Sequence, residues 1–179
     1  TAAVATPETI IKAAQRGHNI MLIPMAGHVT RGLIETYHEA WKEAGHAGKG
    51  RVMLAHHMLC HEDADEAVRI ARDPLNRYLR SLVDSASDWM GGASSNDYPG
   101  YDKIIAELDK ENFDTQVEKG VGWIGTPDRI IEMIEGYTDL VGGFEVASLQ
   151  VNFNTISYED AAASMRLFGE KVIPHFAGG

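Results

Sequence analysis

The stretch Gly122-Trp123-Ile124-Gly125-Thr126-Pro127-Asp128, with the segments that follow it as far as Phe176, decides the fold. Thr126 is suited to cap a helix, and Pro127 suits the first helical turn, where the missing N–H of proline costs nothing. Apolar residues then recur every three to four positions, and a glycine pair follows them. This spacing predicts a helix that ends near Val141.

A strand and a second helix are expected next. The segment from Phe144 to Val151 is apolar at nearly every position, which is typical of a strand covered on both faces. Ser157 is a suitable cap for a helix from Tyr158 to Val172 that carries one apolar stripe. Strand, helix, strand and helix in this order are the repeat of an α/β fold with a parallel sheet.

The N-terminal part of the chain shows the same rhythm. We expect a strand end over 1–5, strands over 19–24 and 51–61, and helices over 6–17, 31–44 and from 62 to about 83. Residues 85–121 are rich in Gly, Ser and Asn and interrupt the rhythm, so they are predicted to form a long loop insertion that acts as a lid. About four strands precede helices, which is half of the eight in a closed barrel.

The amino-acid composition limits the classes of binding partner that we expect. The 179 residues include 16 Lys and Arg against 26 Asp and Glu, a net charge of −10, which disfavours a nucleic-acid partner. No apolar run approaches the roughly 18 residues of a membrane span, and the first residues lack the basic lead of a signal peptide. A single cysteine, Cys60, fits a reducing compartment. We therefore expect a cytoplasmic protein that binds neither nucleic acid nor membranes.

Four motifs together resemble the bacterial luciferase-like, FMN-dependent monooxygenases, in that family's order and spacing. They are Thr6-Pro7-Glu8-Thr9, Val52 to Ala67, Gly125-Thr126-Pro127-Asp128 and Ala163 to Phe176. The resemblance implies that residues 1–179 form one partial domain, the C-terminal half of a (β/α)8 TIM barrel from the end of strand five to helix eight. Residues 85–121 would be its mobile lid. The barrel's first half would then carry the catalytic residues, which are not assigned here.

The resemblance also implies a cofactor and its site. Reduced FMN, supplied by a separate flavin reductase, and dioxygen would oxygenate a small organic substrate such as an aldehyde or ketone. Ala5, Thr6 and Thr9 match the family's flavin-phosphate turn, and free N–H groups at a helix start favour an anion. Taken without the resemblance, the same residues are more simply a capped helix.

Two other functions stay open. Related barrels use a deazaflavin for hydride transfer, and a non-catalytic flavin-binding half-barrel subunit is the third possibility. The expected partners are the missing N-terminal half or a partner chain, and an open strand edge predicts an oligomer.

The cluster His56, His57, Cys60 and His61 suggests a metal site at first sight. In a strand, however, His56 and Cys60 face one way while His57 and His61 face the other, so the ligand set is split and no metal is expected. One of the histidines is instead expected to line the barrel mouth.

Further candidates lie in loops. His28 is placed in the loop after a strand, where barrel enzymes keep active-site groups, although a solvated histidine fits equally well. Trp89, Met90 and Tyr98 of the insertion would either cover the flavin or anchor the loop.

Overall fold

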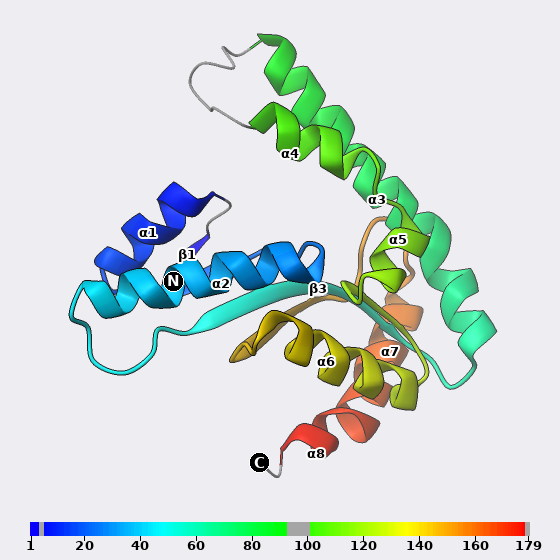
Figure 1. Cartoon of the computed structure of the whole chain (residues 1–179). Coiled ribbons are helices and arrows are strands. Elements are labelled where there is room, and N and C mark those ends of the chain that lie inside the picture. The colour runs from blue at the N-terminus through cyan, green and yellow to red at the C-terminus, as the bar shows by residue number, and fades with distance from the viewer. Residues whose placement is uncertain (4–5, 93–100, 178–179) are drawn as a thin grey trace.

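The computed structural model describes residues 1–3, 6–92 and 101–177, in which strands and helices alternate (Figure 1). The strands are β1 (Ala2–Ala3), β2 (Ile20–Leu22), β3 (Val52–Cys60), β4 (Gly122–Gly125) and β5 (Val146–Gln150). The helices are α1 (Pro7–Gln15), α2 (Gly27–Glu43), α3 (Ala64–Gly92), α4 (Tyr101–Leu108), α5 (Phe113–Glu118), α6 (Pro127–Val141), α7 (Tyr158–Lys171) and α8 (Ile173–Phe176). The α/β class with a parallel sheet is confirmed.

The strands form one sheet in which every pair is parallel. The central strand β3 pairs with three others. His57 lies opposite both Gly122 of β4 and Gln150 of β5, so these two strands occupy opposite edges of β3. Met53 lies opposite residues of both β2 and β5, so β2 shares its edge with β4. In a barrel that follows chain order, β5 would lie beside β4 instead.

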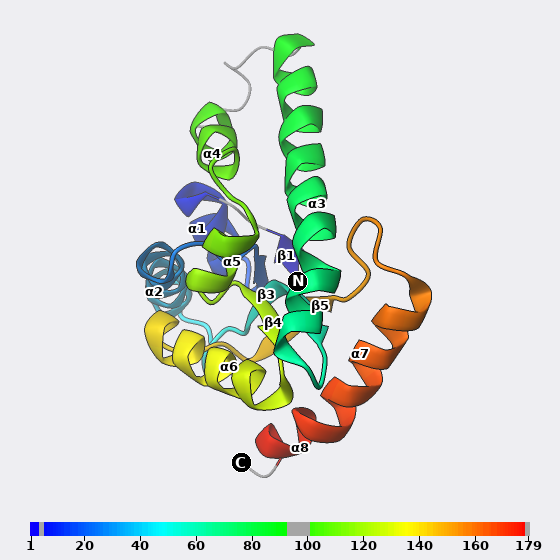
Figure 2. The ribbon, with the colours of Figure 1, turned by 90° about the vertical axis from the view of Figure 1, so that its right-hand side faces the viewer.

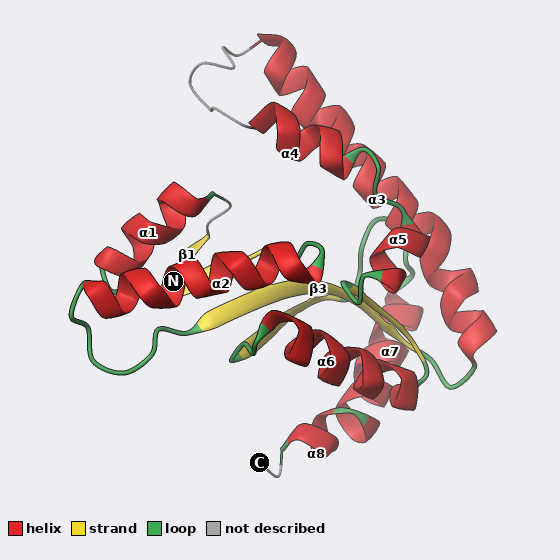
Figure 3. Cartoon of the chain, viewed as in Figure 1, coloured by secondary structure: helices red, strands yellow, loops and turns green. Residues whose placement is uncertain are grey.

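The two faces of the sheet are covered by different helices. Along β3, Val52, Leu54 and His56 are buried, whereas Met53 and Ala55 between them are partly exposed. The buried set packs under α1, α2 and α6, and Figure 3 shows α2 and α6 on the same side of the sheet. The face that bears Met53, Ala55 and His57 is called the inner face below. At its carboxyl end it is covered by α3.

One expectation about a strand is wrong. The segment 144–151 was predicted as a strand buried on both faces, but β5 is an edge strand with half-buried Val146 and Leu149 and three exposed residues. An apolar run shows only that a segment can be buried. Here β5 is exposed because, within the described residues, β3 is its only neighbour in the sheet. The described residues hold five strand–helix units, where about four were expected from the sequence. The assignment of these units to strand five through helix eight of a barrel stays a prediction.

The insertion is more helical than predicted. The helix expected to end near Val83 continues as α3 to Gly92, a length of 29 residues, and Figures 1 and 2 show it extending away from the sheet with α4 beside it. Serine costs a helix only a few tenths of a kcal/mol relative to alanine, so a helix already packed through Leu75 and Leu79 continues through Ser85 and Ser87. The mobility of the lid stays a prediction.

The base of the insertion is tied to α3. Arg72 makes two hydrogen bonds with Asp114 of α5, at 2.6 and 2.8 Å, and its guanidinium lies 4.3 Å from the ring centre of Phe113. Asn76 Oδ1 accepts a hydrogen bond from the Phe113 N–H at 2.7 Å. Contacts of this kind fix α5 against the part of α3 that lies nearest the sheet.

Candidate functional site

All five strands are parallel, so the turns that follow them meet at one edge of the sheet. These turns carry Thr6 after β1, Ile23 to Ala26 after β2, and His61 after β3. The carboxyl edge of a parallel sheet is where β/α proteins place their ligands. The candidate site therefore lies at this edge.

Thr6 and Thr9 lie together in the first turn of α1, as predicted. Thr6 Oγ1 accepts a hydrogen bond from the Thr9 N–H at 3.4 Å, and the Thr6 N–H donates to Thr9 Oγ1 at 3.2 Å. The two hydroxyl oxygens are 3.0 Å apart. This reciprocal arrangement is a capping box, and it follows directly from a threonine at the cap and another three residues later. Ala5 lies outside the described residues.

The turn fits an anion such as a phosphate. Thr9 is exposed, Thr6 is partly exposed, and the start of α1 carries the positive end of the helix dipole. The Thr9 hydroxyl donates to Thr6 O at 2.8 Å, so it must rotate to meet an anion. The carboxylate of Glu8 in this turn opposes an anion, and its hydrogen bond with Lys12 lowers the pKa of Glu8 and so keeps it charged. The positive charge of Lys12, 2.6 Å from that carboxylate, offsets the repulsion.

A second group of contacts holds the turn after β2. The Met25 N–H donates to Thr30 Oγ1 at 2.9 Å, and the Tyr137 hydroxyl donates to Met25 O at 2.8 Å. Tyr137 and Thr30 are also joined at 3.1 Å between their hydroxyl oxygens. Sequence reasoning missed this group because nothing local to Tyr137 in α6 signals a partner in the turn after β2.

His28 is placed differently from the prediction. Helix α2 begins at Gly27, four residues before the expected Arg31, so His28 is an exposed residue of the first helical turn and not of a loop. Gly27 permits close approach of α6, since a Cβ there would lie 2.1 Å from Leu140 Cδ2.

The histidines of β3 face opposite ways, as predicted. His56 is buried and stacks on Trp123 with 3.9 Å between ring centres, and its Nδ1 donates to Val121 O at 2.9 Å. His57 meets Tyr78 and Phe153 edge-on on the inner face. Burial lowers the pKa of each histidine to about 4, so both are neutral at pH 7.

Cys60 is buried in the core, and His61 makes a local hydrogen bond. Cys60 is buried, and burial raises the pKa of its thiol to about 11, which suppresses the nucleophilic thiolate. His61 Nδ1 accepts a hydrogen bond from the Asp63 N–H at 3.0 Å. Among residues 1–3, 6–92 and 101–177, no three His, Cys, Asp or Glu side chains gather as a metal site would need. The side chains of Trp89, Met90 and Tyr98 lie outside the described part.

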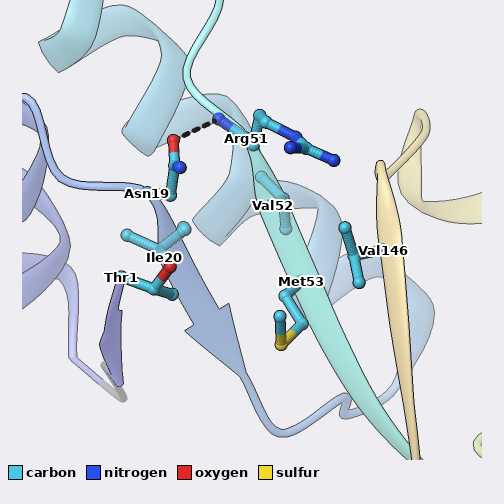
Figure 4. Close-up of a pocket in the computed structure, with 7 residues that line it drawn as sticks. All are labelled: Thr1, Asn19, Ile20, Arg51, Val52, Met53 and Val146. Carbon is cyan, nitrogen blue, oxygen red and sulfur yellow. Dashed lines mark hydrogen bonds between the residues drawn. The ribbon is translucent and has the colours of Figure 1, made fainter.

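A small cavity of about 70 Å³ opens at the other edge of the sheet, where the strands begin (Figure 4). Its lining includes Ile20, Met53 and Val146, with Asn19 Oδ1 accepting a hydrogen bond from the Arg51 N–H at 3.1 Å. Residues at the amino edge of such sheets usually serve stability, so the cavity is separate from the candidate site.

Comparison with known proteins identifies the family. The family model for luciferase-like monooxygenases matches residues 1–142. The chain belongs to the luciferase-like monooxygenase family. A curated relative is the alkanal monooxygenase alpha chain of Photobacterium leiognathi, which is 28% identical over 181 residues that cover 94% of this chain and 49% of the relative.

Solved structures agree on the fold. The monooxygenase RslO1 from Streptomyces bottropensis is 26% identical with a TM-score of 0.70, over 98% of this chain and 47% of that one. The oxygenating constituent of 3,6-diketocamphane monooxygenase from Pseudomonas putida, solved with FMN, is 22% identical with a TM-score of 0.66, over 92% and 44%. A coenzyme F420 dependent tetrahydromethanopterin reductase from Methanopyrus kandleri is 16% identical with a TM-score of 0.61, over 97% and 50%.

Two further observations, on chain length and on membrane-spanning helices, bear on the function. The chain spans about half the length of these relatives. The described helices include none that is both long and apolar enough to cross a membrane.

Proposed function

We propose that this chain forms part of a flavin-dependent monooxygenase that uses reduced FMN and dioxygen to oxygenate a small organic substrate. The observation that carries the proposal is the Thr6–Thr9 capping box at the carboxyl end of β1, in a chain of the luciferase-like family. The relative's name, alkanal monooxygenase, supports an aldehyde as one substrate class.

In this proposal the chain's residues bind and orient the cofactor. Thr6 and Thr9 hold the FMN phosphate with their hydroxyls, and the first turn of α1 adds the N–H of Glu8 and the helix dipole. When bound, the reduced flavin supplies the activation of dioxygen. The first turns of α3, which follows β3, cover the carboxyl end of the inner face. In this proposal the helices that follow β3 would exclude water from the reaction as a lid.

The proposal requires partners. Because the chain spans half the length of its relatives, residues equivalent to their other half complete the barrel, either in the same polypeptide or in a partner chain. Within the described residues β5 pairs with β3 alone, so its other edge is a place for such pairing. A flavin reductase supplies reduced FMN, assembly gives an oligomer, and the cytoplasm is the proposed compartment.

The test compares FMN with riboflavin, which lacks the phosphate. Replacing both Thr6 and Thr9 with Val should weaken FMN binding by roughly a hundredfold, since each lost hydrogen bond to a charged acceptor costs about 1.5–3 kcal/mol. Riboflavin binding should stay unchanged. The matched control is Asn112→Ala with Thr115→Val, which removes the capping box of α5. Equal weakening of both ligands in a folded Thr6/Thr9 variant would place the phosphate elsewhere.

A deazaflavin-dependent oxidoreductase is the second candidate, favoured by the fold shared with the coenzyme F420 dependent reductase. Direct titration separates the two candidates, because a deazaflavin enzyme binds coenzyme F420 more tightly than FMN and transfers hydride without consuming dioxygen. A protein that binds flavin but turns over no substrate in either assay would be the non-catalytic flavin-binding subunit.

A further inference from the structure

The inner face of the sheet carries a polar pair near its carboxyl end. His57 of β3 lies opposite Gln150 of β5 in the parallel register. Paired residues of neighbouring strands point to the same side of a sheet, and the strands are about 4.8 Å apart. Leu149, which precedes Gln150 in β5, packs with residues of the opposite face. His57 and Gln150 therefore lie next to each other on the inner face.

The rest of this face is uncharged. In the described residues of β2, β3 and β5, the other side chains that alternate onto the inner face are apolar or neutral. They are Met21, Met53, Ala55, Leu59, Val146 and Ser148. A charged ligand buried against such a surface would have no counter-charge and would be costly to desolvate. This half of the barrel interior therefore favours an uncharged ligand.

Aromatic rings from two other elements hold the imidazole of His57. Its ring centre lies 5.0 Å from that of Tyr78 in α3 and 5.3 Å from that of Phe153, which follows β5. Nε2 of His57 is buried and has no hydrogen-bond partner within the described residues. A phenylalanine would pack between the same rings without leaving a nitrogen unsatisfied. The cost of the imidazole therefore indicates a use for its other nitrogen, Nδ1.

The environment of His57 makes Nδ1 a hydrogen-bond donor. Burial lowers the pKa of His57 to about 4, so the ring is neutral at pH 7 and carries one proton. Buried N–H groups without a partner are rarer than buried acceptors with unused lone pairs, which favours the proton on Nδ1. The amide of Gln150 offers further N–H donors beside it. Two neutral donors at neighbouring positions suit a carbonyl oxygen, which has two lone pairs.

We propose that His57 and Gln150 are specificity-determining residues that hold the carbonyl oxygen of an uncharged substrate on the inner face. The inference rests on the proposed function, which supplies the reaction, and it adds the residues that select the substrate. These residues belong to β3 and β5, whereas Thr6 and Thr9, proposed to hold the cofactor phosphate, follow β1.

The test uses the native, full-length form of the protein and three probes of similar size. Cyclohexanone carries the carbonyl, methylenecyclohexane has nearly the same shape without the oxygen, and cyclohexanecarboxylate carries a charge. Binding is titrated by ligand-observed NMR, so no turnover is needed. The wild-type protein should bind cyclohexanone most tightly of the three.

Two variants each remove one donor. His57→Phe keeps a ring between Tyr78 and Phe153, and Gln150→Met keeps the length of an exposed side chain, so the second should fold even where the first does not. Each should weaken cyclohexanone binding by about threefold to tenfold, the value of one neutral hydrogen bond, and leave methylenecyclohexane binding unchanged. His57→Asn puts an amide N–H near the position of Nδ1 and should recover part of the preference.

The matched control is His56→Phe. It replaces the same residue type one position earlier in β3, on the opposite face of the sheet, where His56 stacks on Trp123. In folded protein, as checked by thermal melts, this control should leave the ratio of the cyclohexanone and methylenecyclohexane affinities unchanged. An equal loss of preference in the control would show a general disturbance of β3, which overturns the assignment of His57.

The remaining outcomes separate this inference from the proposed function. If both His57→Phe and Gln150→Met are folded and keep the full preference for cyclohexanone, the oxygen is held elsewhere and only the inference fails. Tighter binding of cyclohexanecarboxylate by the wild-type protein would also overturn it, while FMN binding through Thr6 and Thr9 would be unaffected. If the wild-type protein binds neither FMN nor any probe, the proposed function fails and the inference fails with it.

Discussion

The hydroxyl of Tyr137 donates a hydrogen bond to the carbonyl of Met25 at 2.8 Å across a separation of 112 residues. The bond joins α6 to the turn after β2, two units that are distant in the chain and adjacent in space. It shows how the carboxyl edge of this sheet is organised, because side chains of the surrounding helices hold the backbone of the turns.

Replacing Gly50 with Ala should destabilise the fold by roughly 1–3 kcal/mol. A Cβ on Gly50 would lie 2.1 Å from the hydroxyl of Tyr37 and 2.7 Å from the ring of Trp41. Tyr37 is buried and bonded to His18 O, so it has little freedom to move. The control is Gly136→Ala in α6, where nothing lies within 4 Å of the new Cβ. In urea denaturation Gly136→Ala should be neutral or slightly stabilising. An unchanged urea midpoint for Gly50→Ala would contradict the packing of Gly50 against Tyr37 and Trp41.

Acid should destabilise the protein between about pH 6.5 and pH 4. Burial lowers the pKa of His56 to about 4 in the folded state, against about 6.5 in an unfolded chain. The unfolded state therefore binds the proton first, so the stability is fully present above pH 6.5 and is lost as the pH falls towards 4. A shift of this size is worth roughly 3 kcal/mol at most.

His56→Phe is the variant that checks the pH dependence. Phenylalanine keeps a ring against Trp123 but has no group that titrates, so the free energy of unfolding should fall less between pH 7.5 and pH 5 than in the wild type. His28→Phe, at an exposed position, serves as the control. Identical pH profiles for His56→Phe and the wild type would show that His56 is not the source.

Ser164→Ala should cost about 1–3 kcal/mol, because it leaves a buried backbone N–H without a partner. Ser164 of α7 is 2% exposed, and its Oγ accepts the Cys60 N–H at 2.7 Å, beyond the last residue of β3 that pairs with β5. Ser148→Ala, an exposed change in β5, is the matched control. Amide exchange at Cys60 should accelerate only in the Ser164 variant, and unaltered protection there would count against this contact.

Arg72→Ala should loosen α5 while leaving the sheet intact. Arg72 bonds Asp114 twice and lies over Phe113, so it links α5 to α3. Amide exchange over residues 113–118 should become faster. Arg77→Ala removes an ion pair with Asp73 inside α3 and should leave those amides unchanged. If both variants behave alike, the α3–α5 contact does not hold the base of the insertion.

Local chemistry in the sequence was enough to predict the starts of α1, α6 and α7 and the fold class. Thr6, Thr126 and Ser157 were predicted as caps, and each accepts the expected hydrogen bond from a backbone N–H three residues later. The opposite facing of His56 and His57 followed from the two-residue period of a strand. These features depend on residues a few positions apart, so a single sequence carries them. The family resemblance, which the family model confirms, rests on similar short motifs.

The sheet edges and the carboxyl-edge contacts were decided by tertiary structure alone. An apolar run over 144–151 predicted a strand, but its place beside β3, and hence its exposure, depends on which edge was open to it. Glycine and serine over 85–92 favoured a loop, yet packing of α3 carries the helix through them. The bonds of Met25 with Tyr137, and of Cys60 with Ser164, join residues 112 and 104 apart. Contacts at such separations arise only when the chain folds, because no local pattern specifies which distant hydroxyl meets which backbone group.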